Sequence, residues 1–429
     1  MAGSTSSSVS APPTHFDIVV VGAGGVGLTL GVGLALAGFE TAVIGPEAPV
    51  RPGRTVAMLD GSIRQLERFD LWRDLMPRAA PLRAMRIVDA TNSLFRPPPV
   101  TFRASDIGLP MFGRNVENAH LDGALAAAAE RVAGLTRLPT LARAFSFEAD
   151  QASVTLAGGK IITASLVVAA DGRESLARKS ARIGVRQRSY PQVALTTHLT
   201  HTAPHEDIST EFHTREGPFT LVPLPSVDGA SYRSSLVWVM SHREAQRRRA
   251  LPSAALRAEI EAQSRRILGS VTSLGPVGAF PIATSISHRL HAHRLALVGE
   301  AGHALPPIGA QGLNLSFRDV ETLVDTLTTA RSGGEDWTSA ETLSKYERAR
   351  QADVGLRALG VDTLNSSLLS RSPVTDLLRG MGLQALQGSG PLRRWVMRQG
   401  LAPDAPALLG GRKPRLDATN ILGDQASGF

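Results

Sequence analysis

The 429-residue sequence contains no cysteine, which excludes disulfides, thiolate metal sites, iron–sulfur clusters and cysteine nucleophiles. Lysine is also scarce, with four residues, so that arginine supplies nearly all of the positive charge. No apolar run reaches the roughly 18–20 residues that a membrane-spanning helix needs, which excludes a multi-pass membrane protein. The absence of cysteine is consistent with a reducing compartment, and we expect a cytoplasmic protein.

The remaining composition is ordinary for a globular protein, with 43% hydrophobic and 20% charged residues. Lys and Arg number 46 against 38 Asp and Glu, which gives a net charge of +8. Such a surplus can indicate a nucleic acid, an anionic membrane surface or an anionic ligand. Because the arginines are scattered and no basic patch is interleaved with aromatic residues, we expect no nucleic-acid partner.

The first third of the chain has the pattern of a nucleotide-binding α/β fold. Residues 16–21 form an apolar, β-branched run of the kind found in buried parallel strands. A helix is predicted at 26–38 and a second strand at 41–44, which together make a βαβ unit.

The pattern changes in the middle of the sequence. Between about 185 and 280, short segments alternate in a strand-like way and are separated by Pro, Gly and Asp, which favours an antiparallel sheet. One helix, at about 242–268, is predicted to interrupt this sheet. Residues 295–299 return to the buried parallel type, and residues 338–400 are predicted to be mostly helical.

Residues 22–27, Gly-Ala-Gly-Gly-Val-Gly, carry the first motif with a chemical meaning. Gly22 permits a tight turn, Gly24 lets the backbone approach a pyrophosphate, and Gly27 lets helix and strand pack closely. The motif lies between a predicted strand and a predicted helix, as dinucleotide binding requires; the alternative is a structural glycine-rich turn.

One element of this motif is missing. The acidic residue expected about 20 positions further on, for a ribose hydroxyl, is replaced by Gly45, and Glu47 follows two residues later. Either Glu47 reaches back to the ribose, or the ribose is held in another way.

Two further motifs follow buried strands. Asp171-Gly172 ends the strand at 166–170; taken alone, such a pair is often only a turn. Gly299-Glu300 ends the strand at 295–299 and is followed by the Pro- and Gly-rich segment 306–314, which opens a helix. An acid there can bind a ribityl or ribose hydroxyl, and the helix N-terminus can stabilise negative charge on a reduced ring.

Together these motifs resemble the aromatic-hydroxylase class of flavoprotein monooxygenases, and most closely its ubiquinone-biosynthesis hydroxylases. The segment Arg54-Thr55-Val56-Ala57 resembles that group's segment after the second strand, and residues 118–125 resemble its helix that meets the flavin chain. Residues 306–314 are similar to the loop beside the isoalloxazine ring. Glu300 stands where the family usually has an aspartate.

The resemblance implies an α/β fold with a glutathione-reductase-type FAD-binding Rossmann domain, an inserted antiparallel-sheet substrate domain and a helical C-terminus. The implied boundaries are a disordered tail at 1–15; an FAD-binding domain at 16–80, 112–184 and 281–340; a substrate domain at 81–111 and 185–280; and a C-terminal helical region at 341–429.

The resemblance also implies FAD as cofactor, NAD(P)H as co-substrate and transfer of one oxygen atom from dioxygen to a phenol ring that carries an apolar tail. The expected FAD-binding residues are Gly22, Gly24, Gly25, Gly27, Glu47, Arg54, Asn118, Asp171, Gly172, Gly299, Glu300, Gly312, Leu313 and Asn314. The expected catalytic loop residues, with no side-chain acid or base assigned, are Pro306, Gly309, Gln311 and Gly312.

Leu221 and Pro223, in an apolar strand that ends at a proline, are predicted to form a wall of the substrate cavity; the alternative is ordinary sheet core. His288, His291 and His293 have a spacing that could hold a metal, but no carboxylate is close in sequence, so we expect no metal site. One of His198, His201 and His205 could face the substrate, although solvent exposure is the simpler expectation.

Residues 377–401 mix apolar and arginine side chains without any acid, a composition found in helices that lie on membranes. We therefore expect peripheral contact with a membrane, or delivery of the substrate by other quinone-biosynthesis proteins; the alternative is a helical pair packed on the FAD domain.

Two other functions remain open for the protein as a whole: an FAD oxidoreductase that inserts no oxygen, such as a polyprenyl reductase, and a non-catalytic flavin-binding scaffold.

Overall fold

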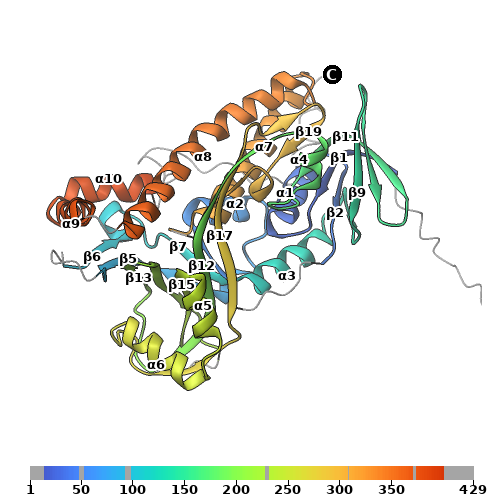
Figure 1. Ribbon diagram of the computed structural model, residues 1–429. Coiled ribbons are helices and arrows are strands. Elements are labelled where there is room, and N and C mark those ends of the chain that lie inside the picture. Colours follow the sequence, from blue (N-terminus) through green and yellow to red (C-terminus); the bar gives the residue numbers. More distant parts are fainter. Residues whose placement is uncertain are drawn as a thin grey trace, which may run out of the picture.

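The structure is a computed structural model that describes residues 14–47, 53–91, 98–227, 231–307, 309–370 and 373–400. The predicted tail therefore lies outside the described residues up to residue 13, while His15 already begins the first strand. Residues 401–429 also lie outside the described part. Two large sheets and a layer of C-terminal helices make up the described molecule (Figure 1).

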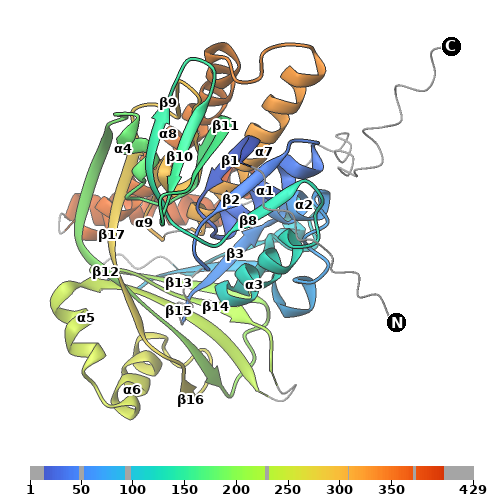
Figure 2. The same ribbon diagram turned by 90° about the vertical axis from the view of Figure 1, so that its right-hand side faces the viewer.

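The first sheet has the predicted Rossmann arrangement at its centre (Figure 2). Its parallel strands lie in the order β8-β2-β1-β11-β19. Their bounds are Leu135–Leu138 for β8, Thr41–Ile44 for β2, His15–Val21 for β1, Ile161–Ala169 for β11 and Leu295–Leu297 for β19. The antiparallel strands β9 (Ala142–Phe147), β10 (Ala152–Leu156) and β18 (His291–Ala292) complete it.

Helices cover this sheet and enclose its core. The helix α1 (Gly25–Leu36) is apolar on every side, and it is buried because α3 (Asn118–Ala129) and α7 (Gln311–Ser332) both contact it. The short helices α4 (Leu176–Ser180) and η3 (Gly299–Ala301) follow the ends of β11 and β19. The ends of β11 and β19 thus each lead directly into one of the predicted motifs.

The second sheet is mostly antiparallel and has the order β20-β17-β12-β15-β14-β13-β5-β6, with β16 beside β12. Its bounds are His303–Ala304 (β20), Gly278–Ser287 (β17), Val185–His201 (β12), Tyr232–Ser241 (β15), Gly217–Leu224 (β14), Ile208–Thr214 (β13), Ala84–Asp89 (β5), Val100–Arg103 (β6) and Val271–Leu274 (β16). The boundary expected at residue 280 falls inside β17, because this long strand pairs with β12 along most of its length.

A small sheet joins the two large ones. It has the order β3-β7-β4, with bounds Thr55–Leu59, Gly113–Glu117 and Ala79–Leu82. The helix α2 (Asp60–Arg68) and the short helices η1 (Met76–Arg78) and η2 (Ala104–Ile107) lie in the same part of the chain. Asn115 of β7 donates to the carbonyl of Pro223 in β14 at 2.8 Å, which ties the small sheet to the second sheet.

The helix predicted at 242–268 is two helices, α5 (His242–Arg249) and α6 (Ser253–Gln263). Pro252 separates them, because proline disfavours the helical conformation of the residue before it. The C-terminal region consists of α8 (Ala340–Leu369), α9 (Pro373–Gly388) and α10 (Gly390–Gly400). Figure 1 shows α9 and α10 beside β6, where Leu383 and Met397 are buried against Val100 and Phe102.

Candidate functional site

The described residues enclose a cavity of about 870 Å³ that both large sheets help to line. The glycine-rich turn, the start of α3 and the loop before α7 line it from the Rossmann side, and strands β13, β14 and β15 line it from the second sheet. Of the predicted site residues, the following line this cavity: Gly22, Gly24, Gly25, Gly27, Glu47, Arg54, Asn118, Asp171, Gly172, Glu300, Pro306, Gly309, Gln311, Gly312 and Leu313.

The glycines of the first motif have distinct roles in the packing. Gly22 has a φ of +119°, and a Cβ there would lie 2.2 Å from the carbonyl oxygen of Ala170. A Cβ at Gly27 would lie 1.8 Å from the carbonyl oxygen of Gly22. A Cβ at Gly24 would meet no described atom within 4 Å, because this position faces the open cavity at the N-terminus of α1. The turn thus leaves space beside backbone N–H groups, as a bound pyrophosphate requires.

The missing acid at Gly45 has a steric reason. A Cβ at Gly45 would lie 2.5 Å from the backbone nitrogen of Ala23, so the turn itself occupies the space of a side chain. Glu47 is exposed and lines the cavity, and so does Arg137 at the end of the neighbouring strand β8. Sequence reasoning missed Arg137, because only the pairing of β2 with β8 brings it to the edge where Glu47 lies.

Oδ1 of Asn118 and Oδ1 of Asp171 are two of the buried oxygens in the cavity lining that have no hydrogen-bond partner among the described residues; Oδ1 of Asn115 is another. The other oxygen of Asp171 accepts from the backbone nitrogen of Leu176 at 2.8 Å and so caps α4. Asn118 begins α3, and its backbone nitrogen donates to the carbonyl of Arg54 at 3.0 Å. Buried polar atoms are normally satisfied, so these two oxygens indicate a place for a ligand with hydroxyl or N–H donors.

The Gly299-Glu300 motif forms the turn η3 at the end of β19. Glu300 lines the cavity with a side chain that is 55% exposed, and its Oε2 lies 3.8 Å from Nε of Arg173. Gly299 does not line the cavity. Its backbone nitrogen donates to Oδ2 of Asp319 at 2.9 Å, so Gly299 fixes the turn instead. Arg178 is buried and donates to the carbonyl of Ala301 at 2.7 Å, which holds η3 next to the Asp171-Gly172 turn.

The loop before α7 is held by its own side chains. Gln311 donates to the carbonyl of Gly309 at 2.9 Å and accepts from Arg357 of α8. Asn314 does not line the cavity, because its amide is used by the protein. It accepts from the backbone nitrogen of Leu59 at 2.8 Å and donates to the carbonyl of Ala310 at 2.6 Å. Asn314 therefore pins the loop to the small sheet.

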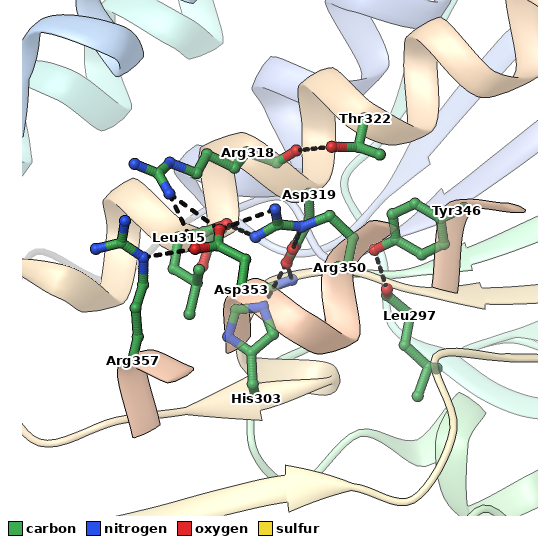
Figure 3. Close-up of polar contacts among 12 residues, drawn as sticks. Leu297, His303, Leu315, Arg318, Asp319, Thr322, Tyr346, Arg350, Asp353 and Arg357 are labelled. Carbon is green, nitrogen blue, oxygen red and sulfur yellow. Dashed lines mark hydrogen bonds and ion pairs between the residues drawn. The ribbon is translucent and has the colours of Figure 1, made fainter. Parts of the chain in front are cut away.

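A buried network of charges lies behind this loop (Figure 3). Asp319 of α7 accepts from Nε2 of His303 at 2.6 Å and from Nε of Arg350 at 2.7 Å. Burial acts to raise the pKa of the Asp319 carboxyl, but His303 and Arg350 outweigh burial, so that its pKa lies below the usual value. Asp353 binds Arg318, Arg350 and Arg357, which likewise hold its pKa below the usual value against the effect of burial.

The structure corrects the predicted substrate wall by one residue. Leu221 is buried in the core on the far side of β14, and Pro223 does not line the cavity. Thr220 and Val222 line it instead, with Val237 from the paired strand β15. Side chains alternate along a strand, so Leu221 and Pro223, the two residues predicted to form the wall, lie on the face of β14 opposite to that of Thr220 and Val222.

The histidines singled out in the sequence lie elsewhere. His205 lines a second cavity of about 290 Å³, and burial lowers its pKa and that of His201. His291 lies 3.7 Å from Oε2 of Glu347, whereas Nε2 of His293 contacts the carbonyl of Glu148 at 2.8 Å. Within the described ranges, no group of three or more metal-ligating side chains is gathered.

The sequence matches a family model and several known proteins over most of its length. The model of a family described as "FAD binding domain" matches residues 15–356. Ubiquinone hydroxylase UbiL of Rhodospirillum rubrum is 33% identical over 407 residues, which cover 92% of each chain. The 3-demethoxyubiquinol 3-hydroxylase of Escherichia coli is 32% identical over 394 residues, which cover 90% of this chain and 98% of that protein.

Solved structures support the fold. The p-nitrophenol 4-monooxygenase PnpA of Pseudomonas putida superposes with a TM-score of 0.74 at 17% identity, covering 91% of this chain and 99% of that one. With the family match and the named relatives, this fold and cavity identify an FAD-dependent monooxygenase. The chain belongs to the FAD-binding family that matches residues 15–356, and within it to the ubiquinone hydroxylases.

Proposed function

We propose that this monooxygenase hydroxylates the aromatic ring of a polyprenylated phenol in ubiquinone biosynthesis, with NAD(P)H as electron donor. The observation that carries this proposal is the continuous cavity, which runs from the glycine-rich turn to the second sheet. At the sheet end the cavity is lined by the apolar residues Leu82, Met85, Phe112, Val222 and Val237, together with the polar residues Asn115, Ser209, Glu211 and Thr220. Such a lining suits an aromatic ring with an apolar tail. The names of the two bacterial relatives point to the same substrate class.

The geometry suggests how FAD lies in the cavity. The pyrophosphate fits the open space at Gly24, where the N-terminus of α1 favours negative charge. Asn118 and Asp171 offer their unpartnered oxygens to hydroxyl or N–H groups of the cofactor, and Glu300, which also lines the cavity, can accept from a hydroxyl of the ribityl chain. The flavin ring then lies beside residues 305–307 and 309–313.

When bound, FAD accepts electrons from NAD(P)H and activates dioxygen; the protein supplies placement and shelter from water. The N-terminus of α7 begins at Gln311, so its backbone N–H groups favour negative charge on the reduced ring. Arg357 holds Gln311, and Asn314 pins the loop from the other side. These contacts keep Pro306 and Gly309–Leu313 in place as the wall next to the ring.

We further propose that α9 and α10 contact a membrane surface or a partner that delivers the substrate. Met381 and Trp395 are 57% and 62% exposed, and Arg394 and Arg398 are exposed as well. Leu383 and Met397 are core residues, and the side chains of Leu377, Leu378 and Arg379 lie outside the described part. No helix in the described ranges has both the length and the apolar character required to cross a bilayer.

The main proposal is tested by lipid analysis of a strain that lacks the gene. An accumulated polyprenylphenol precursor, restored to ubiquinone by the wild-type gene, supports the proposal. Incubation of the purified holoenzyme with the accumulated precursor, NAD(P)H and ¹⁸O₂ should then place ¹⁸O in the product. A product without ¹⁸O would favour an oxidoreductase that inserts no oxygen. No flavin reduction by NAD(P)H even with the precursor would favour a non-catalytic scaffold.

A further inference from the structure

One carboxylate faces the substrate end of the cavity from the second sheet. Glu211 lies on β13, and its side chain is only 9% exposed although it lines the cavity. Ser209, two residues earlier on the same face, also lines the cavity. Thr210, which lies between them, and Phe212, which follows Glu211, are buried and face the other side, where Phe212 belongs to the core.

Glu211 has two polar neighbours on the sheet. Nε2 of His213 lies 2.8 Å from its Oε1, and the hydroxyl of Thr220, which is directly opposite on β14, donates to Oε2 at 3.4 Å. No lysine or arginine among the described residues forms an ion pair with Glu211. His213 is itself buried, and its Nδ1 has no hydrogen-bond partner in the described part of the chain.

A buried carboxylate of this kind is costly unless a ligand or a partner uses it. Glu211 lines the same cavity as residues 305–307 and 309–313, which belong to another part of the chain. A phenol ring placed between them can therefore bring one carbon towards the flavin loop while its hydroxyl faces Glu211. The neighbouring lining residues Val222 and Val237 are apolar and leave Glu211 as the strong hydrogen-bond acceptor of that wall.

Resting on the proposed hydroxylation, we propose that Glu211 is the catalytic residue that accepts the proton of the substrate's phenolic hydroxyl, and that His213 is the positioning residue that holds the carboxylate. The ring carbon forms its new C–O bond to an oxygen atom that derives from dioxygen; the O–O bond breaks, and its electron pair leaves with the other oxygen atom, which ends as water with the electrons that NAD(P)H supplies. The ring thereby loses electron density, and its hydroxyl becomes strongly acidic. The O–H bond then breaks, its electron pair remains on the phenol oxygen, and the proton forms a new O–H bond on Glu211. The ring carbon that bears the new oxygen then loses its hydrogen as a proton to solvent, and the proton on Glu211 returns to the phenol oxygen, so that the ring is aromatic and Glu211 is ionised again.

The first test measures the function of the carboxylate in turnover. Glu211→Gln keeps the shape of the side chain and removes its basicity. With 2-geranylphenol as the probe, we expect product formation to fall by about 100-fold, in the usual range for a general base. We expect NAD(P)H oxidation to continue with release of hydrogen peroxide. Glu211→Asp should restore part of the coupling, and Glu206→Gln, at an exposed position outside this cavity, should match the wild type.

The second test needs no turnover. 4-Nitrophenol absorbs visible light only when ionised, so its charge state in the holoenzyme can be followed by difference spectra across pH. A carboxylate beside the hydroxyl disfavours the phenolate, so the wild type should hold the uncharged phenol to higher pH than Glu211→Gln does. His213→Asn should give an intermediate midpoint. Equal midpoints in the wild type and Glu211→Gln, or unchanged product formation by that variant, would overturn the proposal while leaving ring hydroxylation intact. A wild type that inserts no ¹⁸O would instead overturn the proposed function.

Discussion

Arg350 of α8 donates from Nε to Oδ1 of Asp319 of α7 at 2.7 Å, with side-chain exposures of only 6% and 1% (Figure 3). The other oxygen of Asp319 accepts from His303 and from the backbone nitrogen of Gly299. One carboxylate thus joins the C-terminal helix α8 to the turn that presents Glu300 to the cavity. The C-terminal helical region is therefore part of the support of the cofactor site.

Asp319→Asn should destabilise the protein strongly. The substitution preserves the shape of the side chain but leaves the buried guanidinium of Arg350 without this counter-charge, which typically costs about 3–5 kcal/mol. Denaturant unfolding of the FAD-loaded protein measures this loss. Glu335→Gln, which removes an exposed pair with Lys345, is the control and should cost at most about 1 kcal/mol. Equal losses of unfolding free energy in Asp319→Asn and Glu335→Gln would show that the buried ion pair stabilises the protein no more than the exposed pair does.

The same carboxyl predicts a loss of stability in acid. The pKa of Asp319 is lower in the folded protein than its ordinary value of 3.8, so its contribution to stability is present above that value. That contribution is lost as the pH falls through the folded-state pKa. The free energy of unfolding should therefore fall more steeply in the wild type than in Asp319→Asn as the pH drops below 3.8. Parallel curves for the two proteins would contradict the assignment.

Gly24 and Gly27 should respond differently to valine. Gly24→Val places its side chain in open cavity space, so we expect a folded protein that has lost FAD, because the new methyl groups occupy the place of the pyrophosphate. Gly27→Val would force a Cβ against the carbonyl oxygen of Gly22, so we expect loss of the fold itself. Flavin absorbance and circular dichroism separate the two outcomes. Full FAD occupancy in Gly24→Val would place the pyrophosphate elsewhere.

Local pattern was enough to predict the parallel strands β1, β2, β11 and β19 and the three motifs, because each depends on neighbouring residues, whereas β8 was not predicted. Contacts between segments that are distant in the sequence could not be predicted from such local patterns. Gly45 is a glycine because Ala23 occupies the space beside it, and Arg137 reaches the cavity edge only through the pairing of β2 with β8. Leu221 was assigned to the wrong face, since alternation alone does not say which face of a strand is the cavity side.

The polar residues of the site show the same limit. Glu211 was missed because its meaning depends on the cavity that two distant segments enclose. Asn314 was expected to bind FAD, but its side-chain amide is hydrogen-bonded to the backbone of Leu59 and Ala310. The hydrogen bond to Leu59 joins two positions that are far apart in the sequence. The same residue types occur at ligand-binding positions and at positions that support a ligand site, so only the tertiary contacts of a residue distinguish the two roles.

Glu300→Ala should weaken FAD binding. If the carboxylate accepts a hydrogen bond from the ribityl chain, its removal costs about 1.5–3 kcal/mol in a buried setting. The side chain is 55% exposed, so we expect the lower end of that range, a loss of affinity of about tenfold. Flavin titration of the apoprotein measures the effect, and Glu300→Asp should lose less. Arg173→Ala, which removes the neighbouring charge 3.8 Å away, tests whether that ion pair alone explains the result.

Val222 and Leu221 offer a direct test of which face of β14 meets the substrate. Val222 is half-buried and lines the cavity, so Val222→Arg should fill the substrate space and abolish substrate-stimulated NAD(P)H oxidation while FAD remains bound. Leu221 is 3% exposed and packs in the core with Leu236, so Leu221→Arg should bury an unpaired charge and destabilise the protein. Thermal unfolding and flavin content, measured beside turnover, separate a blocked cavity from a damaged fold. Normal turnover in a folded Val222→Arg protein would mean that the ring binds in another part of the cavity.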